Sequence, residues 1–185
     1  MKREVNPFDY ASDICKALPG GILLTTKQGD KVNSMTIGWG TIGIEWRYPI
    51  FIAFVRESRY TRQILGENPE FTVNIPLGQP DKQILSICGT KSGRDMDKIK
   101  ALGLHLEEPL EISVPGIREL PLTLECKVLY RQQQDLTALP QEVLNRYYPA
   151  EDDTLHPGSE RDYHIAYYAQ IVKAYIIEEE AKPCV

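Results

Sequence analysis

Strand-like segments dominate this chain, and the helical segments between them are too short and too irregularly spaced for a doubly wound parallel sheet. Apolar or alternating runs predict strands at residues 22–26, 32–44, 50–55, 70–75, 120–130 and 163–177. Capping and stop residues predict short helices at 59–67, 81–87, 94–102 and 141–147, and a polar loop at 149–162. This order favours a mainly β protein: a closed, mainly antiparallel barrel with short inserted helices.

The size and charge of the chain limit its organisation and its partners. Its 185 residues suffice for one domain with a hydrophobic core, so we expect a single domain over residues 1–185. The net charge of −5 gives no electrostatic reason to expect nucleic acid or an acidic membrane surface as a partner. No signal-type run opens the chain and no apolar segment reaches membrane-spanning length, which predicts a cytoplasmic protein.

The cysteines and histidines do not form a recognisable metal or nucleophile motif. The four cysteines contain no C-x-x-C pair, and the three histidines are dispersed, so we expect no metal site. Cys88 is interpreted as a small packing residue because no base can be assigned to it. His164 opens the last long strand, where a histidine by itself indicates no function.

The segment from Asn33 to Gly40 gives the first indication of a binding site. In a strand its side chains alternate between two faces, one with Met35 and Trp39 and one with little beyond Thr36 and two glycines. Glycines within a strand indicate either a closely approaching ligand, such as a flat ring, or a bulge or barrel corner. From this segment alone, a bulge or barrel corner is the better interpretation of the two glycines.

The segment from Val55 to Thr61 runs from a buried strand into the first turn of a predicted helix. The start of a helix offers unpaired N–H groups and a positive dipole end, both of which suit phosphate. Arg56 and Arg59 add paired donors, and Ser58 and Thr61 add hydroxyl groups. The alternative is that the hydroxyl groups only cap the helix and the arginines are solvated.

A third segment, from Cys88 to Asp95, contains two glycines, two hydroxyl groups and two cations before a predicted helix. Such a loop can turn its N–H groups toward an anion. It lacks the spacing of a P-loop, so taken alone it is better interpreted as a plain loop.

Taken together and in this order, these segments resemble the flavin reductase-like family, and within it the flavoredoxin-like branch with the FMN-binding split-barrel fold. The resemblance covers about residues 20–178. It rests on an ordered set of segments, none of them diagnostic alone: 33–40, 54–61, 71–76, 88–98, 121–126 and 164–172.

The resemblance implies a homodimer that holds one FMN per protomer near the interface. It places residues 33–36 along the flavin ring, 56–61 around the phosphate and 88–92 over the flavin, with His164 near the ring and the nicotinamide. The cofactor-binding residues are accordingly expected to be Asn33, Ser34, Met35, Thr36, Trp39, Arg56, Ser58, Arg59, Tyr60, Thr61, Cys88, Gly89, Thr90, Lys91 and Ser92. For the ring edges we expect backbone N–H groups of 34–36 and 88–90, and we expect Trp39 to pack beneath its strand.

Two features depart from the family pattern. The stretch from 135 to 161 is longer and more polar than a minimal member requires. The last strand also reads Ala166-Tyr167-Tyr168 where the reductases tend to carry smaller residues. Interface aromatics are expected to include Tyr167, Tyr168 and Tyr175.

The leading hypothesis is an FMN-binding oxidoreductase that passes electrons from NADH or NADPH through FMN to an acceptor, with His164 beside the nicotinamide. A second hypothesis is an FMN-binding electron-transfer protein that lacks its own nicotinamide site and receives electrons from a redox partner protein. A third is a split barrel that binds no flavin and acts as a structural or ligand-binding module.

Overall fold

The computed structural model describes residues 1–149 and 162–178. Within these residues the strands are β1 (Lys2–Glu4), β2 (Ile22–Gln28), β3 (Lys31–Ile37), β4 (Gly40–Glu45), β5 (Tyr48–Arg56), β6 (Glu70–Ile75), β7 (Leu106–Glu107), β8 (Gly116–Ile117), β9 (Leu122–Gln133) and β10 (His164–Ile177). The α-helices are α1 (Ala11–Ala17), α2 (Tyr60–Glu67), α3 (Lys82–Thr90), α4 (Lys98–Leu102) and α5 (Gln141–Tyr147). Short 3₁₀ turns lie at Pro7–Tyr10, Leu18–Gly20 and Leu136–Ala138.

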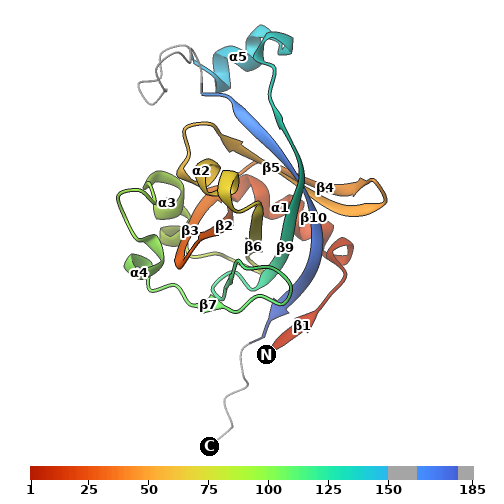
Figure 1. Cartoon of the computed structure of the whole chain (residues 1–185), viewed down its shortest axis with the longest axis vertical. Coiled ribbons are helices and arrows are strands. Elements are labelled where there is room, and N and C mark those ends of the chain that lie inside the picture. Colours follow the sequence, from red (N-terminus) through yellow and green to blue (C-terminus); the bar gives the residue numbers. More distant parts are fainter. Residues whose placement is uncertain (150–161, 179–185) are drawn as a thin grey trace, which may run out of the picture.

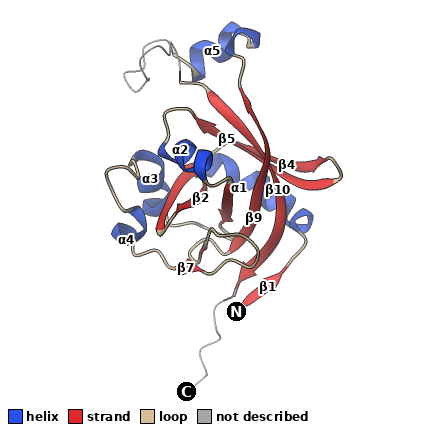
Figure 2. Ribbon diagram, viewed as in Figure 1, coloured by secondary structure: helices blue, strands red, loops and turns tan. Residues whose placement is uncertain are grey.

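The main sheet is antiparallel and curls on itself, with the strand order β3-β2-β6-β9-β10-β5-β4, and β1 pairs with β10 (Figure 1). β3 and β4 lie at the two ends of this order, although only Gly38 and Trp39 separate them in the chain. The sheet must therefore bend until its two ends meet at these residues. The predicted mainly β fold with inserted helices is confirmed (Figure 2).

The prediction of one continuous strand over residues 32–44 is wrong, because the chain leaves the sheet at Gly38 and Trp39. A Cβ on Gly40 would lie 2.8 Å from the Phe51 ring on β5, so Gly40 allows close packing where the chain rejoins the sheet. A Cβ on Gly38 would meet only the Leu18 carbonyl, at 3.5 Å. The barrel-corner interpretation therefore fits Gly40, whereas Gly38 leaves room for a side chain.

The hydrophobic core fills the inside of the curled sheet. On β5 the side chains of Phe51, Ala53 and Val55 are fully buried, while Ile52 and Phe54 on the opposite face are half-buried. This alternation is the period of two that a strand imposes on its side chains. Ile14 of α1 and Leu18, which follows α1, belong to the same core.

The helices of the middle region lie beside β2 and β3 and form one wall of the molecule (Figure 1). α3 is capped by Asp81, as predicted, and is fixed to β3 by a 2.7 Å hydrogen bond from the Thr36 hydroxyl to the Leu85 carbonyl. The predicted helix over 94–102 is wrong at its start, since α4 begins only at Lys98 after the N-cap Asp97. Gly103 ends α4 in the left-handed conformation, with a φ of 62°.

α5 occupies 141–147 as predicted and lies beyond the ends of β9 and β10 (Figure 1). The predicted loop at 149–162, with His156 in it, lies outside the described residues except for its ends, and so does Cys184. Of the described helices, none has the length and apolar character needed to cross a bilayer.

Candidate functional site

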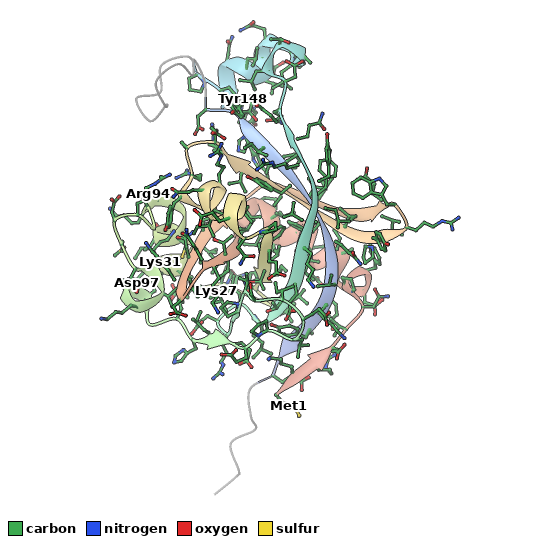
Figure 3. All side chains as sticks on the ribbon, in the orientation of Figure 1. Met1, Lys27, Lys31, Arg94, Asp97 and Tyr148 are labelled. Atoms are coloured by element: carbon green, nitrogen blue, oxygen red, sulfur yellow. The ribbon has the colours of Figure 1, made fainter. Side chains whose placement is uncertain are left out.

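A pocket of about 230 Å3 opens between the start of β3, the start of α2, the end of α3 and the loop before α4. It brings together ten of the predicted cofactor residues: Asn33, Met35, Ser58, Arg59, Tyr60, Thr61, Cys88, Gly89, Lys91 and Ser92. It adds three residues that the list of expected cofactor residues did not include: Gly93 and Arg94, which belong to the third candidate segment, and Lys98. We call it the cationic pocket. Figure 3 shows Arg94 with Lys31 and Asp97 on this side of the molecule.

The charged side chains that line the cationic pocket in the described part of the chain are all cations. Arg59, Lys91, Arg94 and Lys98 line it, and no carboxylate does so among the described residues. Arg94 stacks on the Tyr60 ring, with 5.3 Å from its guanidinium carbon to the ring centroid, and donates to the Ser58 carbonyl at 3.2 Å. In a chain of net charge −5, such a concentration of cations indicates a local anion site.

Lys98 is the buried member of this set, with 4% of its surface exposed. Its ammonium group donates to the carbonyls of Cys88 at 3.4 Å and Lys91 at 3.3 Å, at the C-terminal end of α3. Burial is the largest cause of the lowered pKa of Lys98, and Arg59 lowers it further. An ammonium carries three N–H donors, so one remains for a ligand in the pocket.

Asn33 contributes a buried acceptor. Its amide nitrogen donates to the Thr61 hydroxyl at 3.0 Å, while its Oδ1 is buried without a hydrogen-bond partner in the described parts of the chain. A Cβ on Gly93 would lie 2.0 Å from this Oδ1, so only glycine allows the loop to approach so closely. Buried acceptors are rarely left unpaired, so Oδ1 is an unused acceptor in the wall of the cationic pocket.

The outer edge of β3 supplies backbone groups to the same region. β3 pairs with β2 through a two-residue turn at Gly29 and Asp30, so Gln28 and Lys31 form a hydrogen-bonded pair. Hydrogen-bonded and non-hydrogen-bonded pairs alternate along the two strands from there. Ser34 and Thr36 fall in non-hydrogen-bonded pairs, so their N–H groups point away from β2. The Ser34 side chain is fully buried and shares a 3.0 Å hydrogen bond with Thr25, so only the Ser34 backbone can serve a ligand.

A second pocket, of about 190 Å3, adjoins the first and shares Met35 and Arg59 with it. We call it the His164 pocket, and its other lining residues are Thr36, Ile37, Gly38, Trp39, Phe54, Arg56 and His164. The expectation that Trp39 packs beneath its strand is wrong. Its indole is 39% exposed and lies against His164, with 4.6 Å between ring centroids and 36° between planes.

His164 is neutral at physiological pH. Burial, with Arg56 and Arg59 as smaller causes, lowers the pKa of His164 from 6.5 to about 3. An unfolded chain binds this proton near pH 6.5, so the stability that comes from the neutral ring is complete above that pH and is lost as the pH falls toward 3. Nδ1 shares a 2.8 Å hydrogen bond with the Tyr148 hydroxyl.

Two residues predicted to hold phosphate have internal partners instead: the Asp162 carboxylate for Ser58 and two main-chain carbonyls for Arg56. Asp162 accepts hydrogen bonds from the Ser58 N–H at 3.0 Å and the Ser58 hydroxyl at 2.7 Å. Arg56 donates to the carbonyls of Asp162 at 2.8 Å and Tyr147 at 3.0 Å. Ser58 therefore does not cap α2, whose N-cap is Arg59, and Arg56 holds the chain on both sides of residues 150–161.

The predicted loop from Cys88 to Asp95 begins later than expected. Residues 88–90 form the last turn of α3, so their N–H groups point into the helix and do not serve a ring edge. The Thr90 hydroxyl donates to the Ser86 carbonyl at 2.8 Å, and Thr90 lines neither pocket. Burial raises the pKa of the Cys88 thiol despite the opposing effect of Lys98, which agrees with a packing role.

This arrangement can bind a ligand with an anionic end and a flat polar body. The cationic pocket suits a phosphate, and the unpaired Asn33 Oδ1 suits a hydroxyl or ring N–H. The edge of β3 suits the polar rim of a ring, and the adjoining His164 pocket has room for a second group. Sequence reasoning missed Lys98, whose burial depends on the late start of α4, and Asp162, which is distant in sequence from Ser58.

Curated relatives match about half of this chain. An uncharacterized protein of Archaeoglobus fulgidus is 32% identical over 100 residues, which are 54% of this chain and 55% of the relative. An uncharacterized protein of Pyrococcus abyssi is 27% identical over 106 residues, 57% of this chain and 59% of the relative. The matched length is thus less than two thirds of these relatives.

Solved structures share the fold over most of the chain. The flavoredoxin of Methanosarcina acetivorans is 24% identical with a TM-score of 0.60, over 85% of this chain and 68% of that one. The flavoredoxin of Desulfovibrio vulgaris (Miyazaki F) is 21% identical with a TM-score of 0.61, over 85% and 69%. Nitrilotriacetate monooxygenase component B of Bacillus cereus is 16% identical with a TM-score of 0.62, over 98% and 84%.

The family model extends beyond the segments that carry the sequence resemblance. A model described as the flavin reductase like domain matches residues 16–183, which include every strand of the main sheet except β1. Both pockets lie within the matched residues. Together with the split-barrel architecture, this match shows that the chain belongs to the flavin reductase-like family.

Proposed function

We propose that this chain binds FMN and passes electrons from a reduced nicotinamide nucleotide to an acceptor. The observation that carries the proposal is the cationic pocket, where four cations and no carboxylate among the described residues surround a space beside the edge of β3. The names of the structural neighbours support a flavin, since they include flavoredoxins and an FMN-binding domain of flavin reductases-like enzymes.

The residues present fit FMN. Arg59, Lys91 and Lys98 would hold the phosphate, and the N–H groups that begin α2 would face the same charge. Asn33 Oδ1 would gain the donor that it lacks, from a ribityl hydroxyl or a ring N–H. The edge of β3 at Ser34 and Thr36 would align the polar rim of the ring.

When bound, FMN would supply the redox chemistry. The protein's part is to bind, to orient and to limit water. Trp39 and His164 pack against each other in the His164 pocket, and Arg56 and Arg59 add positive charge to its lining. Hydride transfer needs no strong general base, so His164 need not accept a proton. As a neutral ring it would orient the nucleotide by hydrogen bonding.

The test is the anaerobic addition of NADH or NADPH to the FMN-loaded protein, followed by its visible spectrum. We expect loss of the oxidised flavin absorbance with at least one nucleotide, and the same loss with dithionite as the control for a reducible flavin. Reduction by dithionite but by neither nucleotide would contradict the nicotinamide step. That outcome would favour the alternative, an electron-transfer protein served by a redox partner.

We further propose that two copies of the chain associate through the β4–β5 hairpin and the neighbouring face of β9 and β10. This patch exposes Ile44, Trp46 and Tyr48 with Leu129 and Tyr130, and large apolar patches indicate association. Tyr168 contacts both parts, with ring centroids 6.4 Å from Trp46 and 5.2 Å from Tyr130. The expected roles of Tyr167 and Tyr175 are wrong, because both are buried within the protomer.

The turn at the tip of this hairpin presents Trp46 outward at a conformational cost. Trp46 and Arg47 both have positive φ angles, 51° and 65°, where turns of this kind prefer asparagine and glycine. We expect the Trp46→Gly variant to relieve this strain and to remove the indole from the interface. Light scattering at micromolar concentration should give the mass of two chains for the original protein and of one chain for the variant. A single-chain mass for the original would refute the interface.

A further inference from the structure

We propose that Tyr148 is a positioning residue that fixes His164 in the tautomer with its proton on Nδ1, so that Nε2 is offered as a hydrogen-bond acceptor in the His164 pocket. The ligand class that this pocket then favours is one that donates an N–H or O–H. The identity of that ligand rests on the proposed function, whereas the tautomer does not.

Three side chains from separate parts of the chain meet at this point. Tyr148 follows α5 and is 2% exposed, Gln134 follows β9, and His164 opens β10 and is 6% exposed. The Tyr148 hydroxyl lies 2.6 Å from Gln134 Oε1 and 2.8 Å from His164 Nδ1. The Gln134 N–H also donates to the His164 carbonyl at 3.0 Å, which fixes the spacing of the two residues. Figure 3 shows Tyr148 beneath α5.

The tautomer follows from counting protons. A tyrosine hydroxyl has one proton, and Gln134 Oε1 can only accept, so the Tyr148 proton lies between these two oxygens. Toward His164 the hydroxyl oxygen can therefore only accept. Nδ1 must then carry the imidazole proton, and a neutral ring with its proton on Nδ1 has a lone pair on Nε2.

The surroundings keep the ring neutral. The charged groups that act on His164 are Arg56 at the end of β5 and Arg59 at the start of α2, and both disfavour a second proton. Trp39 covers one face of the ring and Tyr148 meets its Nδ1 edge, with 5.6 Å between the Tyr148 and His164 ring centroids. Among the described residues nothing hydrogen-bonds to Nε2, which leaves that atom to a ligand of the pocket that His164 lines.

The hydrogen bonds among Gln134, Tyr148 and His164 also suggest a role for the long stretch after β9. α5 and Tyr148 belong to it, and Arg56 donates to the carbonyls of Tyr147 within it and of Asp162 just after it. The stretch thus delivers Tyr148 to the pocket. A reduced nicotinamide fits the resulting specificity because its carboxamide has N–H donors, whereas the corresponding carboxylic acid has none when ionised.

The test reads the tautomer directly. The full chain is labelled with 15N-histidine, and long-range 1H–15N correlation spectra are recorded at pH 7, with the His164 signals assigned from a His164→Asn sample. We expect Nδ1 to be protonated and Nε2 to be unprotonated in the original protein. A proton on Nε2 there would overturn the proposal.

The Gln134→Leu variant makes the test sharper. Without the amide acceptor, the Tyr148 hydroxyl can turn its proton toward Nδ1, so the proton of His164 should move to Nε2. Gln133→Leu, at the exposed neighbouring position, is the control and should leave the tautomer unchanged. An unchanged tautomer in Gln134→Leu, with a melting temperature like that of the control, would also overturn the proposal.

A kinetic readout separates this inference from the proposed function. If NADH or NADPH reduces the protein, Gln134→Leu should raise KM for the nucleotide about fivefold and affect kcat less, on the scale of one neutral hydrogen bond. Equal KM values for Gln134→Leu and Gln133→Leu would contradict the ligand preference. If neither nucleotide reduces the protein, the proposed function fails, and the 15N spectra still decide the tautomer.

Discussion

Replacement of Lys98 by methionine should weaken FMN binding by about 1.5–3 kcal/mol, roughly a ten- to hundredfold rise in Kd, the scale for a hydrogen bond to a charged group. Lys98 is buried in the cationic pocket and has a donor left for a ligand after its bonds to two carbonyls. A phosphate brought against this ammonium would be poorly screened by solvent, so the loss should exceed that at an exposed cation.

The same substitution also has a predicted effect on the stability of the apo protein. Burial lowers the pKa of Lys98 and so opposes its charge, but its removal leaves the Cys88 and Lys91 carbonyls without this donor, so the free energy of unfolding should fall by about 1–2 kcal/mol. Lys100→Met, on the exposed side of α4, is the control for both quantities. Calorimetric titration with FMN and thermal melting of the apo proteins measure the effects. An unchanged Kd for FMN in Lys98→Met would contradict a role in phosphate binding and would leave Lys98 only the structural role of donating to the carbonyls at the end of α3.

The second large effect is expected at Gly93. Alanine at this position would place its Cβ 2.0 Å from Asn33 Oδ1 and 3.0 Å from the Tyr60 ring, so the Asn33 amide must turn or the loop must withdraw. We expect FMN binding to weaken by about 1–3 kcal/mol, the usual scale of overpacking. Gly66→Ala is the matched control, because a Cβ there meets nothing within 4 Å and Gly66 lies in α2.

A double-mutant cycle decides whether Asn33 mediates this effect. Asn33→Ala removes the atom that the new Cβ would strike, so Gly93→Ala should cost much less in the Asn33→Ala background than in the original protein. FMN titrations of the four proteins give the coupling energy. Additive effects would show that Gly93 acts on the pocket through something other than Asn33.

The sequence predicted the parts of this protein that depend on local pattern. The runs 22–26, 50–55, 70–75 and 163–177 predicted the strands β2, β5, β6 and β10, and Asp81 and Gly103 mark helix ends through well-understood capping chemistry. The resemblance to the family brought the three candidate segments to one region. The structure places ten of the predicted residues in the cationic pocket.

The rest depended on contacts that no local pattern records. The alternation of side chains runs through Gly38 and Trp39 without a break, although the chain crosses there from one end of the sheet to the other. Serine is a common helix cap, which is why Ser58 was expected to cap α2. Instead, its N–H and its hydroxyl group both donate to the carboxylate of Asp162, 104 positions later in the chain. In a helix over 94–102, Lys98 would be an ordinary lysine facing solvent. Because α4 begins only at Lys98, the side chain is buried instead.

Titration of the apo protein with FMN and with riboflavin, at low and at moderate salt, tests the central claim most directly. The two ligands share the ring and the ribityl chain and differ in the phosphate. If the cationic pocket holds that phosphate, FMN should bind at least about tenfold more tightly than riboflavin at low salt. The difference should narrow as salt screens the exposed arginine and lysine side chains. Equal affinity for the two ligands would contradict the account.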